Sequence, residues 1–119
     1  FYPRDSTPGC TLEAREFQAA LADFEELGIR VLGVSGDSEA SHQRFSSKQG
    51  LSFLLLTDPQ QAAARAWGVW GRKVLYGKES MGIVRSTFVV DAKGVVRGVW
   101  RGVKVKGHVA QVLEHCRAL

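Results

Sequence analysis

The side chains best suited to chemistry lie in one short segment, Pro3-Arg4-Asp5-Ser6-Thr7-Pro8-Gly9-Cys10-Thr11-Leu12-Glu13. A helical spacing of apolar residues begins at Thr11, so Cys10 falls where a loop becomes a helix. The free N–H groups and the positive dipole end of a helix favour a thiolate over a thiol, and the thiolate is the nucleophile. The segment therefore predicts a reactive cysteine, with a small apolar residue packed at a helix start as the alternative.

Four neighbours of Cys10 strengthen the prediction of a reactive site. Thr7 lies three residues before Cys10, so that in a tight turn its hydroxyl reaches the sulfur. Glu13 lies three residues after Cys10 and on the same side of the helix. Pro3 and Pro8 stiffen the loop. Taken alone, these residues leave redox chemistry, acyl transfer and a purely structural cysteine open.

The rest of the chain offers weaker candidates for chemistry. A cysteine hydrolase needs a histidine base, but His42, His108 and His115 are each predicted to be surface or helix-end histidines. The acidic residues are spread over different elements, and adjacent His115-Cys116 do not suit one metal, so no metal site is predicted. Basic residues interleaved with Trp100 leave a nucleic-acid-binding module as an alternative, although a solvated sheet face is the favoured interpretation.

Helical and strand patterns alternate along the chain. One helix is expected from Thr11 to Gly28, where an apolar face is formed by Phe17, Ala20, Leu21, Phe24 and Leu27. The elements expected after it are a strand at 29–34, a helix capped by Ser38 or Ser41 that ends near Gly50, a strand at 53–56, a short helix at 60–67, a glycine-rich loop at 68–82, a hairpin of strands at 86–91 and 95–100, and a last helix containing Val109, Val112, Leu113 and Cys116. This order predicts an α/β fold with a mixed sheet.

Length and composition predict one domain over residues 1–119. Hydrophobic residues make up 45% and charged residues 24%, which excludes a disordered or collagen-like chain. The apolar runs are far shorter than the roughly 20 residues of a membrane-spanning helix. The net charge of +4 is scattered along the chain, so it is weak evidence for a nucleic-acid partner.

The order of several motifs points to a known family. The pattern Pro3-x-x-x-Thr7-x-x-Cys10 resembles the active-site signature of the peroxiredoxins. The chain is most similar to their bacterioferritin-comigratory-protein, or Q-type, subfamily, and the similarity extends over essentially its whole length. The further blocks that carry it are Tyr76-Gly77-Lys78, Gly82-Ile83, Arg85-Ser86-Thr87-Phe88 and Val103-Lys104-Val105-Lys106-Gly107-His108.

This resemblance implies a thioredoxin-like fold, with a mixed central sheet flanked by helices, and a thiol-dependent peroxidase that uses no cofactor. It implies that Cys10 is the peroxidatic cysteine, whose thiolate attacks hydrogen peroxide or an organic hydroperoxide and becomes a sulfenic acid. Thr7 would hydrogen-bond the peroxide, and Arg85 would favour the thiolate and stabilise the leaving oxygen. Pro3 would shield the pocket, and Glu13 would hold Arg85 in place.

The sequence departs from the subfamily pattern at a second cysteine. Many Q-type members carry a resolving cysteine five residues after the peroxidatic one, where this chain has Arg15. The other thiol, Cys116, falls on the apolar face of the last helix and is predicted to be a core residue. We therefore expect a one-cysteine cycle in which thioredoxin, glutaredoxin or a small thiol reduces the sulfenic acid. An intermolecular bridge through Cys116 is the alternative.

A second departure concerns the start of the chain. In the family, a hairpin and a central strand precede the equivalent of Phe1-Tyr2-Pro3, so the sequence is expected to be truncated. The missing strand would lie between residues 29–34 and 86–91 and leave both edges bare. A redox-inert thioredoxin-like binding or scaffold domain is then an alternative function. The resemblance further implies a monomer without membrane contact, in the cytoplasm or, where a transit peptide has been lost, in a plastid.

Overall fold

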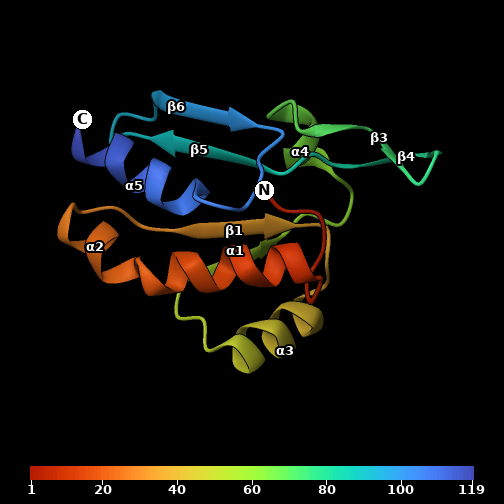
Figure 1. The fold of residues 1–119 in the computed structure, drawn as a ribbon, viewed down its shortest axis with the longest axis horizontal. Helices are drawn as coiled ribbons and strands as arrows, with labels where there is room; N and C mark the ends of the chain where they lie inside the picture. Colours follow the sequence, from red (N-terminus) through yellow and green to blue (C-terminus); the bar gives the residue numbers. More distant parts are fainter.

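The computed structural model describes residues 1–119, apart from the side chain of residue 75. Helices and strands alternate from α2 to α4, as predicted, and four consecutive strands then precede the last helix (Figure 1). The helices are α1 (Pro8–Ala19), α2 (Leu21–Glu26), α3 (Glu39–Gln49), α4 (Ala62–Ala66) and α5 (His108–Arg117). The strands are β1 (Leu32–Ser35), β2 (Leu54–Thr57), β3 (Trp70–Leu75), β4 (Lys78–Ile83), β5 (Ser86–Val90) and β6 (Val96–Arg101). None of the helices among the described residues is long and apolar enough to cross a membrane.

The strands form three two-stranded sheets rather than one continuous sheet. β1 and β2 pair in parallel, whereas β3 with β4 and β5 with β6 pair antiparallel. The crossover between β1 and β2 is α3, which begins at Ser38, one of the two predicted caps, whose hydroxyl accepts from the Ser41 N–H at 3.1 Å. The helix ends at Gly50, whose φ of 64° suits a residue without a Cβ.

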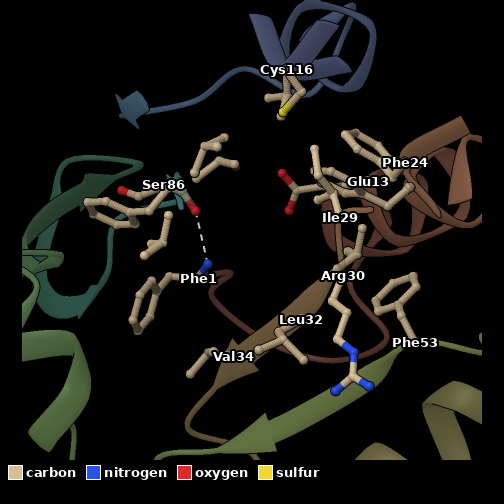
Figure 2. A pocket seen from close by; sticks show the side chains of 18 of the residues that line it. Phe1, Glu13, Phe24, Ile29, Arg30, Leu32, Val34, Phe53, Ser86 and Cys116 are labelled. Atoms are coloured by element: carbon tan, nitrogen blue, oxygen red, sulfur yellow. Dashed lines mark hydrogen bonds between the residues drawn. The ribbon is translucent and has the colours of Figure 1, made fainter. Parts of the chain in front are cut away.

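The first two residues lie between the β1–β2 and β5–β6 sheets. The Tyr2 N–H donates to the Val34 carbonyl of β1 at 3.0 Å, and the Ser86 N–H of β5 donates to the Phe1 carbonyl at 3.0 Å. The Phe1 amino group donates back to the Ser86 carbonyl at 2.9 Å (Figure 2). A cavity of about 840 Å³, lined by Leu32 and Phe88 among others, extends between the two sheets. This is the place where the sequence predicted bare strand edges.

The region from residue 68 to 82 was expected to be a glycine-rich loop, and this prediction was wrong. It contains the β3–β4 hairpin, in which Trp70 pairs with Ile83 and the two-residue turn is Tyr76-Gly77. Both turn residues have positive φ, 53° and 74°, as a two-residue hairpin of this hand requires. The glycines therefore mark a tight turn and close packing between strands, and not an absence of regular structure. Figure 1 shows the hairpin extending away from the rest of the molecule.

The long N-terminal helix stops before Gly28, whose φ is 75°, as predicted, but it differs from its prediction at its start and in its middle. It begins at Pro8, three residues before Thr11, because a proline ring presets the helical φ and needs no hydrogen-bonded N–H in the first turn. It is interrupted at Ala20, where φ is −93° and ψ is 0°, although Phe24 N–H still donates to the Ala20 carbonyl at 3.1 Å. The earlier start places Cys10 inside the first turn of α1 rather than before it.

Candidate active site

Cys10 lies in the first turn of α1 and is 2% exposed. It packs in one core cluster with Tyr2, Ala14 and Phe45. Its sulfur accepts a hydrogen bond from Nη2 of Arg85 at 3.3 Å, across 75 residues of sequence. The helix N-terminus and the guanidinium both place positive charge beside the sulfur, from two different directions.

Arg85 lies between β4 and β5 and binds both groups that the sequence analysis grouped with it. Its Nη2 donates to Cys10, while its Nη1 donates to Oε1 of Glu13 at 2.8 Å. Burial disfavours its charge, but the Glu13 carboxylate and the Cys10 sulfur outweigh this and raise the pKa of Arg85. The close approach depends on Gly9, because a Cβ there would lie 3.1 Å from Nη2 of Arg85. Arg85 is therefore a fixed cation beside the Cys10 sulfur.

Glu13 projects from the second turn of α1 and is largely buried. Burial raises the pKa of Glu13, and the neighbouring Arg85 guanidinium opposes that rise. Figure 2 shows Glu13 and Cys116 directed into the cavity between the sheets. Because a buried carboxylate is stable only with a partner, Glu13 and Arg85 fix each other's position.

Thr7 is the residue that caps α1, and its hydroxyl does not behave as predicted. The side chain donates to the Arg4 carbonyl at 2.9 Å, whereas the donor that the structure records at the Cys10 sulfur is Arg85. The extended backbone of Thr7, with φ −83° and ψ 154°, turns the hydroxyl back along the loop. Pro3 lies half-buried in the same loop.

The segment before α1, residues 3–7, is called here the active-site loop. A buried polar network, which the sequence analysis missed, connects this loop to α3. Asp5, between Pro3 and Thr7, accepts from the Tyr2 hydroxyl at 2.5 Å and from the Ser41 hydroxyl at 2.8 Å. It also lies 2.7 Å from Nδ1 of His42, which is 5% exposed. The prediction that His42 is a surface residue was therefore wrong, since local sequence gave no sign that Asp5 would fold over it.

His108 lies at a helix end, as predicted, but it is buried rather than at the surface. It opens α5 but is 3% exposed, and its Nε2 lies 2.7 Å from the Thr87 hydroxyl. Burial first, and then the charge of Arg85, lower the pKa of His108. His115 is half-buried and lies near the end of α5, as the helix-end alternative predicted, with Nε2 2.9 Å from the Arg97 carbonyl.

Two further residues complete the description of the site. Cys116 is buried in the α5 core cluster, as predicted, and burial raises the pKa of its thiol. Both cysteines line the cavity, and neither forms a disulfide. Lys73 of β3, which sequence reasoning placed in a loop, lies close enough to the site for Arg85 and Cys10 to act on its charge. Burial and Arg85 lower the pKa of Lys73, and Cys10 opposes this.

The basic stretch around Trp100 is occupied by contacts within the protein. Arg97 forms an exposed ion pair with Asp91 at 3.4 Å, and Arg101 donates to the Trp67 carbonyl at 3.2 Å. Trp100 itself packs edge-on against His115, with ring centroids 5.1 Å apart. These contacts fit the predicted sheet face better than a stacking surface for nucleic acid.

Comparison with known proteins decides the family. The model of the AhpC/TSA family matches residues 1–99. The chain belongs to this family. It is 49% identical over 114 residues to peroxiredoxin Bcp of Bacillus subtilis, a match that covers 96% of this chain and 73% of the relative. It is 48% identical over 118 residues to peroxiredoxin Bcp of Xanthomonas campestris, covering 99% and 74% of the two chains.

Solved structures agree with the sequence comparison. A mutant of Xanthomonas campestris peroxiredoxin Q is 49% identical and superposes with a TM-score of 0.94, over 99% of this chain and 75% of the other. The bacterioferritin comigratory protein of the same organism, in a study of its alkyl peroxide reduction activity, gives a TM-score of 0.93 at 48% identity, with the same two coverages. The chain thus spans about three quarters of these relatives.

These matches confirm the resemblance to the Bcp peroxiredoxins and the thioredoxin-like α/β fold. The protein is a thiol-dependent peroxidase that acts on a peroxide and is regenerated by a thiol. The scaffold and nucleic-acid alternatives are not favoured.

Proposed function

We propose that Cys10 is the peroxidatic cysteine and that Arg85 activates it. The observation that carries this proposal is the guanidinium of Arg85, which binds the Cys10 sulfur at 3.3 Å and the Glu13 carboxylate at 2.8 Å. The thiolate attacks one oxygen of a hydroperoxide, an S–O bond forms, and the O–O bond breaks. The departing oxygen leaves as water or an alcohol after taking up a proton, and Cys10 becomes a sulfenic acid.

Charge moves from sulfur to the departing oxygen during this step, and the roles of the other residues follow from that movement. Arg85 stabilises negative charge on both atoms because its donors are fixed in one plane. Glu13 positions Arg85. The Thr7 hydroxyl uses its hydrogen for the Arg4 carbonyl, so its oxygen is available to accept from the peroxide O–H. Pro3, half-buried in the loop before α1, is assigned the role of shielding the pocket by the family resemblance.

The substrates proposed are hydrogen peroxide and small organic hydroperoxides, and the cycle uses one cysteine. Cys116 is in the core of α5, bonded to no other cysteine, which supports an external reductant. A first thiol forms a mixed disulfide with Cys10 and releases water, and a second thiol restores Cys10. Thioredoxin, glutaredoxin or a small thiol can supply both. We place the protein, as a monomer, in the cytoplasm, where thiols remain reduced.

The test is the rate of oxidation by stoichiometric hydrogen peroxide, read from the mass of the intact chain. Cys10→Ser and Cys116→Ser are compared with the unaltered protein, and circular dichroism confirms that each is folded. We expect oxidation orders of magnitude faster than that of a free thiol, lost in Cys10→Ser and retained in Cys116→Ser. Slow oxidation of a folded, unaltered chain would refute the assignment.

A further inference from the structure

The active-site loop is held at one residue, Asp5, by contacts from three separate parts of the chain. Its carboxylate accepts from the hydroxyls of Tyr2 and Ser41 and pairs with His42, while its backbone N–H donates to Oδ2 of Asp37 at 2.8 Å. Both Asp5 and His42 are more than nine-tenths buried. The carboxylate and the backbone N–H of Asp5 are thus both hydrogen-bonded. These bonds fix the position of the loop two residues before Thr7.

The His42 ring lies between two oxygen atoms of this network. Its Nδ1 faces the Asp5 carboxylate at 2.7 Å, and its Nε2 faces the Leu56 carbonyl at 3.0 Å. Both ring nitrogens are therefore engaged, which fixes the orientation of the ring. The ionisable groups around it are Asp5 and Tyr2 of the loop and Asp37, which follows β1. The ligand-type atoms of Asp5, Asp37 and His42 are occupied by these hydrogen bonds, so the cluster is a network and not an open metal site.

Ser6, between Asp5 and Thr7, has a backbone conformation that needs such an anchor. Its φ is 63°, in the left-handed region, where the Cβ of a non-glycine residue is crowded. Residues in this region persist where surrounding contacts determine the conformation. On one side of Ser6 is the anchored Asp5, and on the other is Thr7, the cap of the helix that carries Cys10. A release of Asp5 would let Ser6 relax and would displace both Thr7 and Cys10.

We propose that His42 is a positioning residue of the peroxidase reaction: it holds Asp5, which keeps Ser6 left-handed and so aligns Thr7 and Cys10 with Arg85. This inference rests on the proposed role of Cys10. It assigns to α3 a part in catalysis, although no residue of α3 touches the sulfur in the recorded hydrogen bonds.

The test uses a substitution that relieves the backbone strain. His42→Gln removes the imidazole that bonds to Asp5, and we expect the second-order rate of Cys10 oxidation by hydrogen peroxide to fall by about 10- to 100-fold, the cost of a catalytic group displaced by roughly 1 Å. Ser6→Gly in the same chain is expected to restore most of that rate, because glycine adopts a positive φ without strain. A merely structural loss at His42 would not be repaired at residue 6.

Two matched controls separate this mechanism from general stabilisation. Gln61 also has a positive φ, 57°, at the start of α4, so Gln61→Gly relieves similar strain away from the site and is expected not to rescue His42→Gln. His115→Gln removes a half-buried histidine near the end of α5, where it contacts the Arg97 carbonyl, and is expected to leave the rate unchanged. Rescue by Gln61→Gly, or failure of Ser6→Gly to rescue, would overturn the proposal.

The unaltered protein supplies the remaining arms of the test. In a crystal structure of the unaltered protein, both ring nitrogens of His42 are expected within hydrogen-bond distance of Asp5 and of the Leu56 carbonyl, a result that does not depend on whether any variant folds. A His42 ring turned away from Asp5 would overturn the proposal. Fast oxidation in both the unaltered chain and His42→Gln would refute this inference alone, whereas slow oxidation of the unaltered chain would refute the role of Cys10.

Discussion

Replacing Arg85 with glutamine removes the fixed charge beside the sulfur, and the structure allows its effect to be sized. A unit charge pair at 3.3 Å interacts by about 5 kcal/mol at an effective dielectric constant of 20. Arg85 contacts the sulfur before the reaction as well as during it, so the full value does not appear in the rate. Removal of one charge-stabilising donor in other enzymes costs roughly 2.7–4 kcal/mol, or 10²–10³ in rate. We therefore expect Arg85→Gln to slow Cys10 oxidation by about 100- to 1,000-fold.

The assay is stopped-flow oxidation of the reduced protein by hydrogen peroxide under pseudo-first-order conditions. Arg72→Gln is the matched control, because Arg72 is an exposed arginine of the β3–β4 hairpin, 3.9 Å from Glu79. Arg85→Lys should fall between the two, since an ammonium cannot bridge Glu13 and Cys10 as a planar guanidinium does. A rate for folded Arg85→Gln within a few-fold of the unaltered protein would refute the reasoning.

Three other perturbations follow from the burial and backbone geometry. The pKa of His108 is lowered in the folded protein, so the unfolded chain takes up a proton first. Stability should therefore be lost as the pH falls below about 6.5, and His108→Gln should flatten the fall in urea midpoint. Cys116→Ser should lower the free energy of unfolding in urea by about 1–3 kcal/mol, because it buries a hydroxyl. Cys116→Ala adds no polar group and should lower it by less, and an equal loss in both variants would contradict this explanation. Tyr76→Asn should raise the thermal midpoint, because Asn-Gly suits a turn with two positive φ values, and an unchanged or lower midpoint would contradict the turn assignment.

The elements around the active site were predictable because their signals are local. The cap at Ser38, the stop at Gly50 and the apolar face of α5 each depend on residues within a few positions of one another. The β3–β4 hairpin was missed because its glycines suggested a loop, whereas the Tyr76-Gly77 pair flanked by equal strand lengths was the informative pattern. Neither strand alternates clearly between apolar and polar residues, so the usual periodic signal was weak.

Some residues of the candidate site can likewise be grouped from nearby sequence, whereas others depend on partners that are distant in the sequence. Cys10, Thr7 and Glu13 were grouped by spacing alone, but the link to Arg85 came from family resemblance, since no sequence rule pairs residues 75 positions apart. The burial of His42 and His108 was unpredictable for the same reason: each is covered by a partner, Asp5 or Thr87, that is distant in sequence. Resemblance points to the residues that we propose to react, whereas the structure is needed to find those that position them.

The hydrogen bonds of Phe1 and Tyr2 have a consequence for the order of folding. Phe1 bonds to Ser86, the neighbour of Arg85, and Tyr2 bonds both to Val34 of β1 and to Asp5 in the active-site loop. Contacts across 85 residues close late, because chain entropy opposes them until local structure has formed. On dilution from denaturant, helical circular dichroism should therefore return before fast peroxide reactivity does. The lag between the two signals would report the moment at which the two halves of the chain meet.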